Sequence, residues 1–278
     1  MTLTITTTLP LAGGSAIPQL GLGVWRLSEA DAADVLAEAF DVGLRHIDTA
    51  QGYENEAAVG RAIAASGLLR DEVFVTSKLR TRDFPNAGSS LDGSLRKLGL
   101  GHLDLFLLHW PVPARGTALN AWRALIAAQA AGKVRSIGVS NFLPAHIDSL
   151  VAETGVMPAV NQVELHPYYQ QRDIRDYHRQ NGIVLESYSP LGGGVVLADP
   201  VIGEIARRLG RTPAQVIIRW HLQQGLVALP KTATVSRVAP NAQVFDFALS
   251  EADMAAINAL DRPDGKVLPH PERMNNLF

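Results

Sequence analysis

Residues 45–53 read RHIDTAQGY. In this stretch a short apolar segment ends in a carboxylate, Asp48, and a turn that contains glycine then carries Tyr53. The arrangement recurs twice downstream, where residues 73–77 (VFVTS) lead into Lys78 and residues 103–108 (LDLFLL) lead into His109. Three successive strand candidates therefore each place an ionisable side chain at the carboxyl end.

The rest of the chain repeats this alternation of strand and helix. Strands are expected at residues 20–24, 46–48, 73–77, 103–108, 134–139, 159–163, 183–187 and 226–229. Helices are expected at residues 28–41, 54–65, 89–98, 118–131, 172–181, 202–209, 213–223 and 251–260, with two more after Pro144 and Val235. Alternating strands and helices indicate a parallel sheet. About eight such units in this length predict an α/β fold, the closed (β/α)8 or TIM barrel.

Additions to the barrel are expected at both ends of the chain. Residues 3–20, around Gly13 and Gly14, predict an N-terminal β-hairpin. The helices that follow the last strand are extra C-terminal helices. Because no linker or low-complexity segment interrupts the pattern, we expect one domain that covers residues 1–278.

The composition excludes several classes of protein. Hydrophobic residues make up 47% of the 278 residues and charged residues 19%, which is ordinary for a soluble globular protein. The formal net charge of -2 argues against nucleic acid or an anionic membrane as partner. The chain has no cysteine, no apolar run of the roughly 18 residues that a membrane span needs, and no secretory signal in residues 2–8. We expect a cytoplasmic monomer.

The four ionisable residues suit one chemistry if they meet. Active sites of these barrels lie at the carboxyl ends of the strands, and neighbouring strands are roughly 5 Å apart. Lys78 and Asp48 would form the pair that buried charges require. A tyrosine has a pKa of about 10, and a nearby ammonium lowers that pKa. Tyr53 would then donate a proton to an oxygen that becomes an alkoxide, and His109 would hydrogen-bond the same oxygen.

Each residue also has an ordinary reading when it is taken alone. Asp48 suits the cap of a turn, Tyr53 a half-buried aromatic, Lys78 a surface charge and His109 a core histidine. Four independent coincidences at one face of a barrel are improbable, so the ordered set favours a shared active site.

The chain resembles the aldo-keto reductases from residue 17 to about residue 261. Beyond Asp48, Tyr53, Lys78 and His109, the motifs that carry this resemblance are DTA (48–50) with Asn55 and Glu56, HWP (109–111), GVSNF (138–142), NQVELHP (161–167), YSPLG (188–192) and Pro230 with Lys231. Within the family it resembles the bacterial branch that includes the 2,5-diketo-D-gluconate reductases.

The resemblance implies a cofactor, NADPH, held in extended form across the barrel mouth without a Rossmann domain. The chain accordingly lacks a G-x-G-x-x-G after a first strand. By position, Ser140, Asn141 and Gln162 would hold the carboxamide, Tyr188 would stack on the nicotinamide, Ser189 and Leu191 would bind the pyrophosphate, and Lys231, Thr232, Arg237 and Asn241 would bind the adenosine end. Lys231 and Arg237 suit a 2′-phosphate, which favours NADPH over NADH.

Some positions depart from the family pattern. Pro240 stands where relatives often have an acidic residue, which puts the adenine contact in question. Arg80 stands where many have tryptophan, and residues 192–194 (GGG) make a short, flexible loop after Tyr188. These departures leave substrate selectivity open.

Other aromatic and histidine residues have expected places. Trp25 and Trp110, at strand ends, are expected to wall the substrate pocket, and the tail at residues 263–278 to border it. Trp122 and Trp220 fall on helices and are expected to pack there. His46 is expected to point away from the site, and His102 and His178 to lie on the surface.

These observations predict an NADPH-dependent reductase of small aldehydes, α-dicarbonyls or keto-sugars such as 2,5-diketo-gluconate, with Tyr53 as general acid. One alternative is a catalytically silent NADPH-binding barrel that acts as a regulatory subunit. A second is an aldolase that forms a Schiff base on Lys78. A metal-dependent hydrolase is disfavoured, because Asp48 and His109 lack further clear ligands and Lys78 would compete with the metal.

Overall fold

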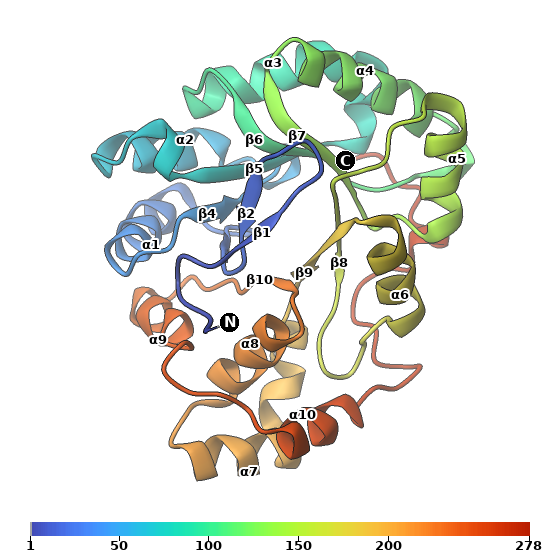
Figure 1. The fold of residues 1–278 in the computed structure, drawn as a ribbon. Coiled ribbons are helices and arrows are strands. Elements are labelled where there is room, and N and C mark those ends of the chain that lie inside the picture. The colour runs from blue at the N-terminus through green and yellow to red at the C-terminus, as the bar shows by residue number, and fades with distance from the viewer. Residues whose placement is uncertain (1) are drawn as a thin grey trace.

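A parallel barrel is the centre of the computed structural model, which describes residues 2–278 (Figure 1). Neighbouring strands of the barrel pair in parallel and follow chain order around the sheet. They are β3 (Leu22–Gly23), β4 (His46–Asp48), β5 (Phe74–Leu79), β6 (Leu103–Leu108), β7 (Val134–Ser140), β8 (Val160–Glu164), β9 (Val184–Tyr188) and β10 (Val227–Leu229). The (β/α)8 prediction is confirmed.

Backbone hydrogen bonds close the barrel between its first and last strands. Gly21 donates to the carbonyl of Ala228 at 3.0 Å, and Ala228 donates to Gln19 at 2.9 Å. Gly23 donates to Pro230 at 3.1 Å. Closure brings all the carboxyl ends of the strands to one mouth.

Helices cover the outside of the barrel (Figure 1). They are α1 (Glu29–Asp41), α2 (Glu56–Ala65), α3 (Ala87–Leu98), α4 (Ala118–Ala130), α5 (Pro144–Thr154), α6 (Arg172–Asn181), α7 (Pro200–Leu209), α8 (Pro213–Gln223), α9 (Val238–Ala242) and α10 (Glu251–Asn258). Local sequence sets their bounds. The Ser28 hydroxyl accepts from Asp31 N at 3.1 Å and caps α1, while Gly99, at φ 67°, ends α3 in the left-handed conformation.

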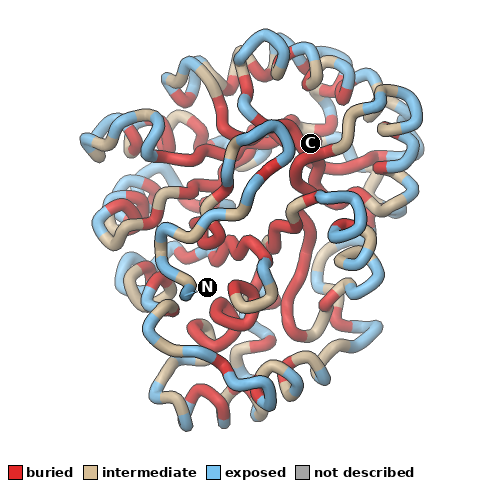
Figure 2. Tube along the Cα trace, viewed as in Figure 1, coloured by how far each residue is buried: buried red, intermediate tan, exposed pale blue. Residues whose placement is uncertain are grey.

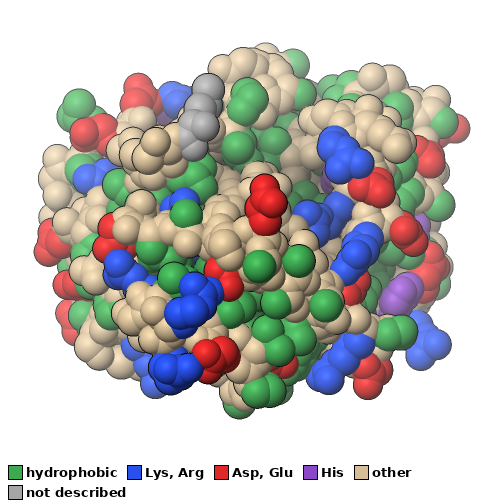
Figure 3. Space-filling view, turned by 60° about the horizontal axis from the view of Figure 1, so that its bottom comes forward, with side chains coloured by type: hydrophobic (Ala, Val, Ile, Leu, Met, Phe, Trp, Pro, Cys, Tyr) green, Lys and Arg blue, Asp and Glu red, His purple; other side chains and the backbone are tan. Residues whose placement is uncertain are grey.

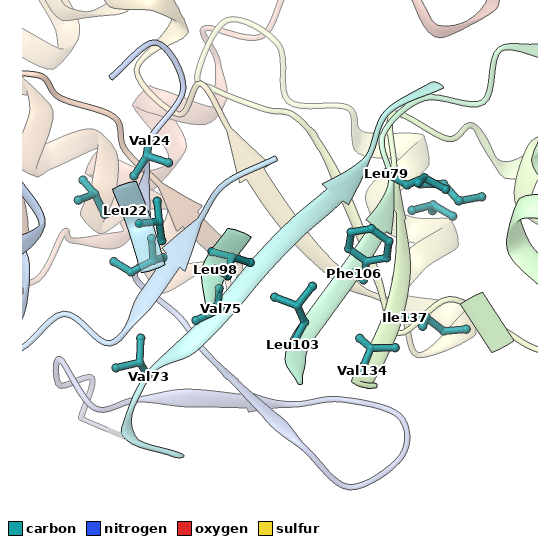
Figure 4. Close-up of a cluster of buried hydrophobic side chains, with 14 of the residues drawn as sticks. Leu22, Val24, Val73, Val75, Leu79, Leu98, Leu103, Phe106, Val134 and Ile137 are labelled. Atoms are coloured by element: carbon teal, nitrogen blue, oxygen red, sulfur yellow. The ribbon is translucent and has the colours of Figure 1, made fainter. Parts of the chain in front are cut away.

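Alternation along the strands divides the core into two layers. Phe106 and Leu108 of β6 belong to the large cluster between strands and helices, whereas Leu105 and Leu107 belong to a cluster inside the barrel. Figure 4 shows part of the large cluster, including Phe106. The barrel strands are buried along most of their length, and most exposed residues lie on the outer helices, the loops and the N-terminal hairpin (Figure 2).

The N-terminal hairpin is present as predicted and closes one end of the barrel. It pairs β1 (Thr8–Pro10) with β2 (Ala16–Pro18) in antiparallel register. Ile17 has no exposed surface and packs with Phe74, Leu105 and Val227 in the cluster inside the barrel. Because Phe74 opens β5 and Val227 opens β10, the hairpin covers the amino ends of the strands and leaves the opposite mouth for a site.

The surface carries both signs of charge. Acidic and basic side chains lie side by side on the face drawn in Figure 3, in line with the formal net charge of -2. Within residues 2–278, no helix combines the length and apolar character that a membrane crossing requires. Met1, which the expected domain includes, lies outside the described residues.

Candidate active site

The barrel brings the four expected residues to its carboxyl mouth. Asp48 is the last residue of β4, Lys78 is one residue from the end of β5, and His109 directly follows β6. Tyr53 ends a 3-10 helix, Gln51–Tyr53, in the loop after β4. Because β4, β5 and β6 are adjacent in the sheet, the side chains converge as the sequence predicted.

Lys78 is the centre of the site's hydrogen bonding. Its ammonium lies 2.7 Å from both carboxylate oxygens of Asp48 and 3.2 Å from the Tyr53 hydroxyl. It also donates to the carbonyl of Thr49 at 3.0 Å. Burial lowers the pKa of Lys78, but Asp48 and Tyr53 more than reverse this, so its pKa lies above the usual value and the ammonium keeps its charge.

The acidity of Tyr53 differs from the sequence-based expectation. Lys78 lowers the pKa of Tyr53 as expected, but burial of the phenol raises it more, and the net pKa lies above 10.0. The expectation of a lowered pKa was wrong because it ignored desolvation. A phenol of this kind remains protonated near neutrality and still donates downhill to an alkoxide, which is a far stronger base.

His109 is a neutral histidine beside Tyr53. Burial and the charge on Lys78 hold the pKa of His109 well below 6.5. Its ring meets Tyr53 edge-on with 5.9 Å between centroids, and Phe278 at 5.1 Å. Nδ1 has no hydrogen-bond partner among the described residues. A neutral imidazole has one N–H to donate, so His109 is suited to hold an uncharged oxygen.

A second group of polar residues lines the mouth from β7, β8 and β9. Tyr188 donates its hydroxyl to Asn141 Oδ1 at 2.7 Å, and Asn141 donates to Ser140 Oγ at 3.1 Å. Gln162 Nε2 donates to Asp48 Oδ1 at 2.8 Å and to Glu186 Oε2 at 2.7 Å. Both amide hydrogens of Gln162 are therefore engaged below the site, so its carbonyl oxygen is the atom that it offers to the pocket.

These groups border one pocket with a cavity volume of about 270 Å³. Trp25, which is 40% exposed, and Trp110, which is buried, form part of its apolar wall as expected. The tail contributes Leu268, Met274 and Phe278, which confirms that it borders the pocket. Small volume and apolar walls around a few converging polar groups are typical of a site for a small molecule.

The residues expected at the outer part of the cofactor site lie on the loops after β9 and β10. Ser189 and Lys231 line the pocket. The others lie beyond its lining: Leu191 before the 3-10 helix Gly192–Ala198, Thr232 buried next to Lys231, Arg237 at the end of the 3-10 helix Val235–Arg237, and Asn241 in α9. Pro240 falls in the first turn of α9, where its missing N–H is tolerated. The binding roles of these residues stay predictions.

Arg80 does not form a pocket wall. Its guanidinium lies 3.0 Å from Asp83 Oδ2, and its backbone N–H donates to Gln51 Oε1 at 3.0 Å. Phe278 instead occupies the space next to Gly52, where an added Cβ would lie 3.1 Å from the phenyl ring. The C-terminal residue therefore forms the wall beside His109.

Two expectations about histidines were wrong. His46 lies two residues before Asp48, so strand alternation places both side chains on the same face, and His46 is buried inside the barrel. His178 is also buried, with Nε2 2.9 Å from Asn161 Nδ2. Trp122 and Trp220 are fully buried, as expected of residues that pack on helices.

Glu186 is the functional candidate that the sequence interpretation missed. It lies in β9, fully buried, in contact with Gln162 and 3.4 Å from His46 Nε2. The signal was present, because Glu186 precedes Tyr188 by two residues and must share its face.

Comparison with known proteins identifies the class. The model of the aldo/keto reductase family matches residues 17–262. The methylglyoxal reductase DkgA of Salmonella typhimurium is 46% identical over 270 residues, which cover 96% of this chain and 98% of that protein. This chain therefore belongs to the aldo-keto reductase family, and it is an oxidoreductase.

Solved structures agree. A crystal structure of a Gox0644 variant in complex with NADPH superposes with a TM-score of 0.93 at 42% identity, covering 96% of this chain and 98% of that one. A structure assigned as a 2,5-diketo-D-gluconic acid reductase B gives a TM-score of 0.87 at 40% identity, covering 97% of this chain and 95% of that one. The expected resemblance to the bacterial branch is confirmed.

Proposed function

We propose that this chain is an NADPH-dependent reductase of small aldehydes, α-dicarbonyls or keto-sugars, with Tyr53 as the general acid. One observation carries the proposal. The Lys78 ammonium contacts both the Asp48 carboxylate and the Tyr53 hydroxyl at the base of a pocket that His109 also lines. This arrangement suits the protonation of an oxygen whose carbon receives a hydride.

The residues of the mouth fit NADPH. Gln162 presents a carbonyl oxygen, and Ser140 and Asn141 present further polar atoms, which suits a carboxamide that both donates and accepts. Lys231, which lines the pocket, and Arg237, which lies beyond its lining, are exposed cations that suit a 2′-phosphate. Tyr188 would flank the nicotinamide ring, Ser189 and Leu191 the pyrophosphate, and Thr232 and Asn241 the adenosine. When bound, NADPH supplies the hydride.

Protein groups perform the remaining steps. His109, as a neutral donor, holds the carbonyl oxygen and sets its direction. Tyr53 gives its proton to that oxygen as negative charge develops on it. Lys78 stabilises the tyrosinate that forms, and Asp48 keeps Lys78 in place.

The substrate class is proposed from the pocket and the relatives. A volume of about 270 Å³ between Trp25, Trp110 and the tail suits a small carbonyl compound. The similar proteins are named for methylglyoxal and for 2,5-diketo-gluconic acid. Reduction of these compounds is therefore the first activity to test.

The test is NADPH consumption with methylglyoxal, an aromatic aldehyde and 2,5-diketo-gluconate, with NADH in parallel. We expect turnover with at least one carbonyl and a preference for NADPH. Binding of NADPH without turnover on any carbonyl would favour the alternative of a silent regulatory barrel, and no binding would refute the cofactor assignment.

The aldolase alternative is weaker. A Schiff base requires an uncharged amine, whereas Asp48 and Tyr53 hold Lys78 in its charged form.

Within residues 2–278, no group of three or more His, Asp or Glu side chains is arranged to hold a metal ion.

The assembly proposed is a monomer of one domain over residues 1–278. It is supported by the pocket, which one chain forms by itself. Light scattering in solution would test it. That the protein does not bind nucleic acid, and that it is located in the cytoplasm, stay predictions.

A further inference from the structure

Glu186 is a buried carboxyl group that the proposed mechanism does not use. It has no exposed surface, and one oxygen, Oε2, accepts from Gln162 Nε2 at 2.7 Å. The other oxygen, Oε1, has no accepted hydrogen bond among the described residues and lies 3.4 Å from His46 Nε2. One satisfied acceptor and one oxygen without a donor is the pattern of a carboxylic acid rather than a carboxylate.

His46, the side chain nearest to that oxygen, provides neither a hydrogen-bond donor nor a positive charge for it. Its Nδ1 lies 3.3 Å from the carbonyl of Pro18, which can only accept, so the ring hydrogen belongs on Nδ1. Nε2 is then an acceptor whose single lone pair takes a hydrogen bond from the Thr76 hydroxyl at 3.1 Å, so it has no hydrogen to donate to Glu186 Oε1, which lies 3.4 Å away. Burial lowers the pKa of His46 to about 3, so the ring is neutral and offers Glu186 no positive charge.

The charges around Glu186 also favour its neutral form. β10 contributes apolar Val227 at the paired position, and β8 contributes uncharged Gln162. The charged groups are Asp48 and Lys78, which already neutralise each other at 2.7 Å. Burial first, and Asp48 second, raise the pKa of Glu186 to about 8.

We propose that Glu186 is a positioning residue that works in its protonated form: it fixes the amide of Gln162 and leaves Lys78 neutralised by Asp48. Its acceptor oxygen engages one hydrogen of Gln162 while Asp48 engages the other, so the Gln162 carbonyl must face the pocket. Because Glu186 is protonated, Asp48 is the only negative charge that the described residues place next to Lys78 at this point of the barrel. An ionised Glu186 would raise the pKa of Tyr53 further. The inference rests on the proposed function, because Gln162 is taken to hold the nicotinamide carboxamide.

Two substitutions separate the hydrogen-bonding role of the protonated Glu186 side chain from the role of its size. Glu186→Gln keeps one acceptor oxygen and one donor, as the acid has, whereas Glu186→Met keeps only the approximate size. We expect Glu186→Met to weaken NADPH binding roughly tenfold, because Gln162 loses a buried partner, and Glu186→Gln to restore most of the affinity. In the wild type, kcat/KM should fall as pH rises through about 8, and this fall should be absent in Glu186→Gln.

Unfolding of the protein without cofactor gives a readout that does not need activity. The folded state of the wild type holds a proton on Glu186 that the unfolded state releases between pH 4.5 and about 8, so its stability should decline across that window relative to Glu186→Gln. The proposal would be overturned if the unfolding midpoint temperatures of the wild type and of Glu186→Gln changed equally with pH across this range. It would also be overturned if Glu186→Gln bound NADPH as poorly as Glu186→Met. If Glu186→Met does not fold, the Gln comparison decides. If no carbonyl is reduced, the proposed function fails, while the unfolding comparison still decides the state of Glu186.

Discussion

At the scale of the residue, the site depends on one buried ion pair. Lys78 has no exposed side-chain surface and Asp48 only 4%, and the carboxylate is useful because it keeps the ammonium charged beside Tyr53. Breaking a buried pair leaves an uncompensated charge, which costs far more than loss of an exposed pair.

Lys78→Met should therefore impair stability and turnover together. We expect the free energy of unfolding to fall by about 3–5 kcal/mol, and kcat to fall because Tyr53 loses the cation that stabilises its anion. Urea unfolding and steady-state kinetics measure the two effects. The matched control is Lys133→Met, which breaks an exposed pair with Asp92 and should cost below about 1 kcal/mol. Equal losses in the two variants would contradict the account.

Strand alternation and chain order were enough to predict which residues meet. Asp48, Lys78 and His109 end adjacent strands, so their convergence follows from the barrel alone. The net pKa of Tyr53 could not be predicted, because it depends on how deeply the phenol is buried. The contacts of Glu186 depend on the barrel's internal packing between β4, β8 and β9.

At the scale of the element, one carboxylate binds residues 266–268 of the C-terminal tail to the barrel. Glu164, the last residue of β8, accepts from Lys266 Nζ at 2.8 Å and from the backbone N–H groups of Val267 and Leu268 at 2.6 and 3.0 Å. Although burial opposes it, hydrogen bonding from His166 and Lys266 lowers the pKa of Glu164 to about 2. The anchor places Leu268 in the pocket wall.

Lys266→Met should loosen this part of the tail. A hydrogen bond to a charged group contributes about 1.5–3 kcal/mol, so we expect amide exchange at Val267 and Leu268 to become roughly tenfold faster, with KM for the carbonyl raised more than kcat is lowered. Hydrogen exchange and kinetics measure this. Arg207→Met, at an exposed pair on α7, serves as control. Unchanged exchange at Leu268 would show that the contact between Lys266 and Glu164 does not help to hold this segment.

The sequence predicted that the tail borders the pocket but not how it is attached. Residues 263–278 contain no long α-helix or strand whose periodicity reveals a buried face. Glu164 stood inside a recognised motif, yet its partners lie about a hundred positions away in the chain. Contacts of this kind are fixed by the folded barrel and leave no local pattern.

At the scale of the whole molecule, the two ends of the barrel have separate tasks. The hairpin packs against the amino ends of the strands, while the pocket and its ionisable residues lie at the carboxyl ends. Stability at one end is therefore expected to be separable from chemistry at the other.

Ile17→Ala tests this separation. Ile17 is fully buried under the hairpin, and truncation of such a side chain costs about 2–5 kcal/mol. We expect that loss in urea unfolding together with an unchanged KM at temperatures where the variant is folded. Leu69→Ala, at a side chain that is 72% exposed, should change stability by about 0.5 kcal/mol or less. A KM altered by Ile17→Ala would mean that the two ends are coupled.

The most direct test of the central claim is the effect of Tyr53→Phe on NADPH-dependent reduction of methylglyoxal. The change removes only the hydroxyl, which lies 3.2 Å from Lys78 Nζ. General acid catalysis raises a reaction rate roughly 100- to 10,000-fold. We therefore predict that kcat falls by at least roughly 100-fold, with the dissociation constant for NADPH nearly unchanged. Turnover that survives the substitution would contradict Tyr53 as the proton donor.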